Sequence, residues 1–312
     1  MDKEDESRKE YLEIALKLKK YKKAIDFSSR VIDEETNIYL KVSAYVYRSK
    51  CFYEMWVMSD QCENKNELLL NAINDATNAI KLKPNREIVE YFAELCLKSK
   101  EYKEVIQTFI ELCDHDSYLK TEYLYYRSKF YSYLCENKQN CKNDEEKAMI
   151  YSLMAQALND AKQAVVLYPK NRFCDLYSEL VFKTEQFKKA VEFFSELIDD
   201  EAIDDFSKRI LYFNRSKCYY ELWKQSKTKE NANTYIERAI KDAVFASKLE
   251  NDDEILSCEL LDHFVEMCEK ANDIRSAIVE FDDLILSTLI ASRKAEYLHF
   301  RSKFYIFVLK TI

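Results

Sequence analysis

The sequence predicts an all-α protein built from one kind of structural unit, the antiparallel helix hairpin. The first observation is that its 312 residues include no glycine and only two prolines. Glycine supplies the positive φ that hairpin turns and phosphate-binding loops need, which argues against most β architectures, Rossmann folds and P-loops. The other two observations are a helical spacing of apolar residues and a set of motifs that recurs along the chain.

Composition and charge exclude several classes of protein. Apolar residues make up 47% of the chain and charged residues 33%, which is the composition of a soluble protein rather than a disordered or membrane-spanning one. The net charge of −8 offers no basic surface for nucleic acid. Ten cysteines without a Cys-x-x-Cys pair indicate a reducing, cytoplasmic location. The charged N-terminus, MDKEDESRKE, is not a signal peptide.

The first recurring motif marks the turn inside a short hairpin and the helix that follows it. In its first copy, Tyr21, Ala24, Ile25 and Ser28 form one stripe of a helix. The four copies begin at Tyr21, Tyr102, Phe187 and Ile274. Because glycine is absent, the turns before three of these positions are predicted to use the Leu, Lys, Ser, Asn and Asp residues of 18–20, 99–100 and 272–273.

The second motif, Arg-Ser-Lys, lies in the first helix of a longer hairpin, and the third, Ala-x-x-Asp-Ala, lies in its second helix. The arginines of the second motif are 79, 88 and 86 residues apart: Arg48, Arg127, Arg215 and Arg301. Three series with a common spacing predict repeat units of four helices each. The units are 1–83, 84–169, 170–250 and an incomplete 251–312, and together they form a single array over 1–312.

These motifs resemble the tetratricopeptide repeat, a helix hairpin of about 34 residues. The segment Asn214-Arg-Ser-Lys-Cys-Tyr-Tyr-Glu-Leu222 is similar to the first helix of co-chaperone repeats. Ala239-Ile-Lys-Asp-Ala-Val-Phe-Ala246 is similar to their second helix. The resemblance implies a right-handed superhelical solenoid whose concave groove binds a peptide or a helix of another protein.

The three complete long hairpins depart from the family pattern by polar insertions of 11, 17 and 11 residues. The insertions are centred on 59–66, 135–144 and 224–233 and are rich in Asn, Lys, Gln and Ser. We expect polar loops that close longer helices, and the alternative is an edge that binds a partner. Cys135 and Cys141 flank the largest insertion, where exposure would make them candidates for oxidation.

The arginines of the Arg-Ser-Lys motif are expected to turn inward, where each needs a carboxylate. The helix that follows offers one in each complete unit, which predicts three structural pairs: Arg48 with Asp75, Arg127 with Asp160, and Arg215 with Asp242. Arg301 is left without such a partner, because the sequence stops at Ile312. The apolar segment 304–308 is then expected to be covered by missing residues or by a partner.

The lysine of each Arg-Ser-Lys motif faces the groove that the resemblance implies. Lys50, Lys129, Lys217 and Lys303 alternate there with Glu13, Glu94, Glu179 and Glu266. Two interpretations stay open: an intramolecular ladder of ion pairs, or a groove that also binds a charged peptide. Tyrosines near the groove complete the candidate partner-binding residues: Tyr53, Tyr125, Tyr133 and Tyr220.

Co-chaperone repeats hold the C-terminal carboxylate of heat-shock proteins with a clamp of Lys, Asn and Arg side chains. In the first unit the positions of that clamp are occupied by Lys9, Glu13, Tyr47, Glu87 and Tyr91. Only Lys9 matches, and carboxylates at such a site repel a carboxylate ligand. We therefore do not expect this protein to bind the heat-shock tail.

No constellation of residues supports catalysis. The three histidines, His115, His263 and His299, lie far apart in the sequence, and Cys113 beside His115 lacks the two further ligands of a metal site. We expect no enzyme activity, cofactor or metal. The sequence favours an adaptor that binds another protein, in chaperone-assisted folding or complex assembly. The alternative is a helper array of a larger protein whose catalytic or J-type domain is absent here.

Overall fold

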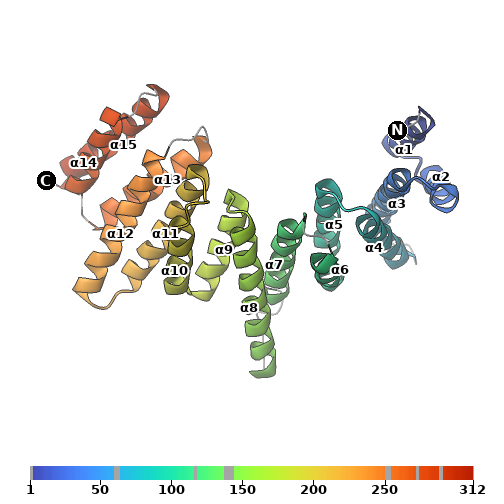
Figure 1. Ribbon diagram of the computed structural model, residues 1–312, viewed down its shortest axis with the longest axis horizontal. Coiled ribbons are helices and arrows are strands. Elements are labelled where there is room, and N and C mark those ends of the chain that lie inside the picture. Colours follow the sequence, from blue (N-terminus) through green and yellow to red (C-terminus); the bar gives the residue numbers. More distant parts are fainter. Residues whose placement is uncertain are drawn as a thin grey trace. The chain divides into compact units, whose positions relative to one another are not determined.

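The computed structural model describes residues 3–59, 64–115, 118–136, 144–249, 254–271, 274–287 and 291–311. Over these ranges the chain forms fifteen α-helices and no strand. The expected all-α, tetratricopeptide-like architecture of helix hairpins is confirmed (Figure 1). No helix among the described residues is both long enough and apolar enough to cross a membrane.

The chain divides into two compact units, residues 1–164 and 165–312. The boundary lies close to the expected junction of the second and third repeat units at 169/170. The helices of unit 1 are α1 (Lys3–Lys17), α2 (Tyr21–Glu34), α3 (Ile38–Met58), α4 (Lys65–Leu82), α5 (Arg86–Ser99), α6 (Tyr102–His115), α7 (Lys120–Glu136) and most of α8 (Asp144–Leu167). Those of unit 2 are α9 (Asn171–Thr184), α10 (Phe187–Ile198), α11 (Asp205–Gln225), α12 (Lys229–Lys248), α13 (Glu254–Ala271), α14 (Ile274–Ser287) and α15 (Ala291–Thr311).

The long hairpins have the most extensive helix packing, between α3 and α4 in unit 1 and between α11 and α12 in unit 2. Figure 1 shows α11 and α12 side by side, joined by a short loop. The alanines of the third motif, such as Ala72 and Ala239, are completely buried at these crossings. A methyl side chain lets two helix backbones approach closely, which explains why alanine recurs there.

The turns of the short hairpins adopt the left-handed conformation for which glycine is favoured. Lys19, Lys100 and Glu185 have φ values of 55°, 64° and 54°. Each is followed by a residue whose backbone N–H donates to a carbonyl five residues earlier, as from Glu101 to Cys96 at 3.1 Å. This is the Schellman ending of a helix. The residues with left-handed backbone are thus Lys and Glu rather than Asn or Asp. The turn expected at residues 272–273, Asn-Asp, lies outside the described residues.

The insertions lengthen helices more than loops. In the third long hairpin the insertion centred on 224–233 lengthens both helices, as expected, and only residues 226–228 form the loop between α11 and α12. Thr228 caps α12 by accepting a hydrogen bond from the backbone N–H of Asn231. Residues 60–63 and 137–143, and with them Cys141, lie outside the described residues. Cys135 is buried on α7 with its Sγ 3.7 Å from the carbonyl oxygen of Ile150, so its expected exposure was wrong.

Candidate functional site

A bidentate ion pair joins the two helices of each complete long hairpin. Nε and Nη2 of each arginine donate to the two carboxylate oxygens of one aspartate, the strongest geometry for such a pair. The donor–acceptor distances are 2.7 and 2.7 Å for Arg48 with Asp75, 2.6 and 2.8 Å for Arg127 with Asp160, and 2.7 and 2.7 Å for Arg215 with Asp242. The structure thus brings together all three of the pairs that the sequence suggested.

The serine of the Arg-Ser-Lys motif forms a second bond across the same hairpin. Its hydroxyl donates to the backbone carbonyl of the alanine that begins the third motif: Ser49 to Ala72 at 2.6 Å, Ser128 to Ala157 at 2.7 Å, and Ser216 to Ala239 at 2.7 Å. All three serines are completely buried. We call the Arg and Ser of one helix, with the Ala and Asp of the next, the hairpin clamp.

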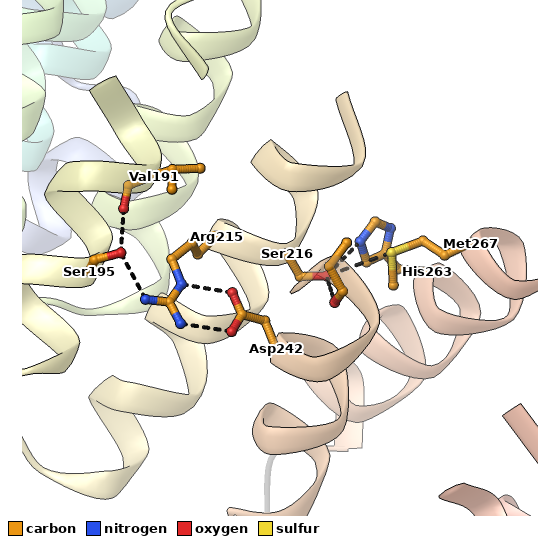
Figure 2. A network of polar contacts seen from close by, with 8 residues as sticks. Val191, Ser195, Arg215, Ser216, Asp242, His263 and Met267 are labelled. Atoms are coloured by element: carbon orange, nitrogen blue, oxygen red, sulfur yellow. Dashed lines mark hydrogen bonds and ion pairs between the residues drawn. The ribbon is translucent and has the colours of Figure 1, made fainter. Parts of the chain in front are cut away.

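The helix before the clamp supplies a further contact to the arginine. In unit 2, Nη1 of Arg215 donates to Oγ of Ser195, which itself donates to the carbonyl of Val191 (Figure 2). Ser29 contacts Arg48 in the same way in unit 1. Burial lowers the pKa of the Arg215 guanidinium, but the hydrogen bonds to Asp242 and the attraction of the Asp242 charge and other nearby groups together outweigh this effect and raise the pKa. Burial also raises the pKa of Asp242, against the opposing effect of Arg215.

The fourth arginine differs from expectation, because it does have a carboxylate partner. Nη1 of Arg301 forms an ion pair with Asp282 of α14, the preceding helix. Asp282 stands eight residues after Ile274, as Ser29 does after Tyr21 and Ser195 after Phe187. Phe304 is completely buried and packs on Phe281 of α14 at 5.7 Å between ring centres, so the segment 304–308 is not wholly uncovered. The side chains of residues 307 and 308 lie outside the described part of the chain.

The ladder of ion pairs between groove lysines and glutamates does not form within the described residues of either unit. Glu179 pairs with Lys183 at 2.7 Å and Glu266 with Lys270 at 2.6 Å, four residues along the same helix. Lys303 pairs with Asp262 at 3.5 Å. A glutamate loses less side-chain freedom when it pairs with a lysine one turn away on its own helix than when it pairs with a lysine on a neighbouring helix. This explains why the pairs within one helix form in place of the ladder.

The groove lysines instead lie against aromatic rings. Nζ of Lys129 is 5.3 Å from the centre of the Tyr125 ring. Nζ of Lys217 is 3.9 Å from the Phe213 ring, where burial lowers the pKa of Lys217 although Asp175 and Glu259 raise it.

The four candidate groove tyrosines differ in how far they are exposed to solvent. Tyr53 and Tyr133 are half-buried, each near another aromatic ring: Trp56 at 5.5 Å from Tyr53 and Tyr102 at 5.8 Å from Tyr133. Tyr125 is also half-buried. Tyr220 is buried between Trp223 and His263, with ring centres 5.3 and 5.6 Å away. Tyr220 is therefore part of the packing in unit 2.

A cavity near the expected groove lies in unit 1 between α1, α3 and α5. Its volume of about 340 Å³ falls within the range of ligand-binding pockets, ~300–1,000 Å³. We call it the α1–α3–α5 cleft. It is lined by Lys9, Asn37, Tyr39, Leu40, Val42, Ser43, Val46, Tyr47, Lys50, Lys83, Asn85, Glu87 and Ile88.

Three lysines from three different segments meet at this cleft. Lys9 comes from α1, Lys50 from α3 and Lys83 from the end of α4, whereas Glu87 is the single carboxylate in the lining. Among the described residues none of these lysines forms an ion pair with a carboxylate. The cleft therefore has a local positive charge on a chain whose net charge is −8.

Aromatic rings hold two of these lysines in place. Nζ of Lys50 lies 5.6 Å from the centre of the Tyr47 ring and 5.4 Å from that of Tyr91. Nζ of Lys83 donates to the Tyr39 hydroxyl at 2.5 Å, and this hydrogen bond together with the lysine charge lowers the pKa of Tyr39. Lys50 was recognised in the sequence. The contributions of Lys83 and Tyr39 were missed, because they belong to no repeated motif.

The described residues include no group of three or more His, Cys, Asp or Glu side chains placed to hold a metal ion. No protein-family model and no curated protein matches the chain. Several solved structures match the chain, among them the following two. The first is a monomeric mutant of IFIT1 with Gppp-AAAA, with a TM-score of 0.42 and 12% identity over 91% of this chain and 68% of that one.

The second is a tetratricopeptide repeat protein from Parabacteroides merdae, with a TM-score of 0.36 and 15% identity over 90% of this chain and 98% of that one. The chain itself has the features of a tetratricopeptide-like fold. Three motif series recur along it, and they form antiparallel hairpins held by the same clamp. The fold of this chain is that of a tetratricopeptide-like helical repeat protein.

Proposed function

We propose that this protein is a non-catalytic scaffold that binds an acidic peptide segment of another protein in the α1–α3–α5 cleft. The observation that carries the proposal is the meeting of Lys9, Lys50 and Lys83 around one cavity without a paired carboxylate. Lysines in that arrangement attract an anionic ligand, and the remaining acidic surface of the chain directs such a ligand to the cleft.

The lining also favours a peptide over a small inorganic anion. Leu40, Val42 and Ile88 are buried apolar side chains that contribute to the walls. An aliphatic or aromatic residue of the ligand can bury its side chain on them, while neighbouring Asp or Glu residues reach the lysines. The binding energy then comes from apolar contact, and the charges provide selectivity and a fast association rate.

Lys50 is the lysine best prepared for binding. Its side chain is half-buried and lies over Tyr47 and Tyr91, so fewer of its rotamers remain to be lost when a ligand binds. The seven cysteines whose side chains the structure describes are buried and form no disulfides, which supports a reducing, cytoplasmic setting. An adaptor in chaperone-assisted folding or complex assembly would use the cleft to recognise its client.

The proposal can be tested by selecting peptides from a random displayed library with the full chain as bait. Selected peptides should combine Asp or Glu with an adjacent aliphatic or aromatic residue. Fluorescence anisotropy then measures their affinity for the wild type and for Lys9→Ser/Lys83→Ser, two exposed positions where substitution leaves the packing intact. We expect the double variant to bind at least about tenfold more weakly, and added salt to weaken binding to the wild type.

The matched control is Lys22→Ser/Lys23→Ser, which makes the same charge change at exposed positions of α2 outside the cleft. This control should bind the peptides as the wild type does. Equal weakening by both double variants, or selection of peptides without acidic residues, would show that the cleft is not an acidic-peptide site.

A further inference from the structure

Helix α15 contains one half of a hairpin clamp. Arg301 and Ser302 stand in the same register as Arg48 and Ser49, Arg127 and Ser128, and Arg215 and Ser216. In the complete hairpins these serines are 0% exposed and each donates to an alanine carbonyl of the next helix. Ser302 is exposed and donates to the carbonyl of His299 within its own helix.

The apolar residues around Ser302 are exposed in the same way. Leu298, Tyr305 and Ile306 are 42%, 47% and 51% exposed. The residues equivalent to Tyr305 in α7 and α11, Tyr131 and Tyr219, are buried. The exposed face of α15 is thus the face that the second helix covers in a complete long hairpin. We call the surface formed by Leu298, Ser302, Tyr305 and Ile306 the α15 face.

The hydrogen bonds of Arg301 show which part of the clamp is missing. In the clamps of Arg48 and Arg215, Nη1 binds a serine of the preceding helix, while Nε and Nη2 bind the aspartate of the following helix. In α15 the contact with the preceding helix is made by Nη1 to Asp282. No described residue bonds to Nε or Nη2 of Arg301, which are the two atoms that receive the second helix.

We propose that the α15 face binds an amphipathic helix of a partner protein that presents alanine and aspartate three residues apart, in the pattern Ala-x-x-Asp-Ala. The alanine allows the close approach at which Ser302 can donate to a backbone carbonyl. The aspartate accepts from Nε and Nη2 of Arg301. Apolar residues on the same side of the incoming helix cover Leu298, Tyr305 and Ile306.

The chain itself provides a probe with this chemistry, because α12 presents Ala239 and Asp242 to α11. A synthetic peptide with the sequence of residues 229–248 can be labelled with fluorescein and made helical by a lactam between Glu237 and Lys241. These two side chains are exposed, four residues apart, and outside the clamp. The lactam offsets the low helicity that a free peptide of this length has in water.

Fluorescence anisotropy would measure binding of this peptide to the full chain. We expect saturable binding, at least about tenfold weaker for the peptide with Asp242→Asn and for the chain with Ser302→Trp. Position 302 is exposed, so a tryptophan there obstructs the α15 face without entering the core. Ser302→Trp leaves α11 unchanged, and so it separates binding at α15 from displacement of the chain's own α12.

Three outcomes would overturn the proposal. The first is no saturable binding, and the second is equal binding to the wild type and to Ser302→Trp. The third is concentration-dependent dimerisation in sedimentation velocity that Ser302→Trp abolishes, because a second copy of this chain would then be the occupant. The proposal is independent of the α1–α3–α5 cleft, so Lys9→Ser/Lys83→Ser should bind the helical peptide normally.

Discussion

Arg301 of α15 pairs with Asp282 of α14, one helix before it, whereas Arg215 of α11 pairs with Asp242 of α12, one helix after it. The two arginines occupy the same position of the repeat. An arginine turned toward the packed side of its helix requires a carboxylate, and the repeat can supply one from either neighbour. The burial of the two pairs differs, and their contributions to stability should differ accordingly.

Asp242→Ala should destabilise unit 2 more than Asp282→Ala does. The side chains of Arg215 and Asp242 are 14% and 6% exposed, so the substitution leaves a largely buried guanidinium without its partner, at a cost of about 3 kcal/mol. The side chains of Arg301 and Asp282 are 28% and 44% exposed, and their pair contributes less than about 1 kcal/mol. Urea denaturation followed by circular dichroism compares the two variants. Equal losses would contradict the structural distinction between the pairs.

The clamp serines offer a test with an internal control. Ser216→Ala removes a buried hydrogen bond to the Ala239 carbonyl and should lower the free energy of unfolding by about 1–2 kcal/mol. Ser302→Ala changes the same motif at an exposed position and should stay within about 0.5 kcal/mol of the wild type. Urea denaturation followed by circular dichroism measures both changes in the free energy of unfolding. A large effect at position 302 would mean that α15 is already covered in the isolated protein.

Glycine should stabilise this protein at the positions where its conformation is needed. Lys100 has a left-handed backbone at the end of α5, so Lys100→Gly should raise the free energy of unfolding by about 1 kcal/mol. The control is Lys98→Gly, in the last turn of the same helix, which should lower it by up to about 1 kcal/mol. Thermal unfolding should show opposite shifts of the midpoint. Two shifts of the same sign would contradict this interpretation of the turn.

The stability of unit 2 should depend on the protonation of His263. Burial lowers the pKa of His263 from 6.5 to about 4, and the charge of Lys217 contributes in the same direction. The unfolded chain therefore takes up a proton that the folded chain resists, and stability falls as the pH drops from 6.5 toward 4. The loss amounts to as much as about 3 kcal/mol.

Urea midpoints measured across that pH range test the prediction. His263→Gln should flatten the dependence, whereas His299→Gln, at an exposed histidine, should leave it unchanged. An identical pH profile in the wild type and in His263→Gln would assign the effect to other groups.

The sequence is sufficient to predict the hairpins and the three buried Arg–Asp pairs, because motifs at a constant spacing imply equivalent positions in space. The partner of Arg301 was also predictable, because Asp282 stands at the position of Ser29 and Ser195 in the repeat. It was missed because a carboxylate for Arg301 was sought only in the helix that follows and not in the helix that precedes it. The α1–α3–α5 cleft was not predictable in the same way. Lys9, Lys50 and Lys83 belong to different elements, and only their packing brings them together. The predicted ladder of ion pairs between groove lysines and glutamates does not form within the described part of the chain, because Glu179 and Glu266 pair with lysines of their own helices instead.

The three complete clamps use the same chemistry, and this has a consequence for how the chain finds its fold. Helices α4, α8 and α12 all present Ala-x-x-Asp-Ala, so the clamp itself does not distinguish a correct partner from one in another hairpin or another molecule. Closing a short loop costs less entropy than closing a long one, so the neighbouring helix arrives first. At high protein concentration we expect refolding to slow, as helices exchange between chains. Order along the chain, rather than the specificity of the contact, decides which helices pair.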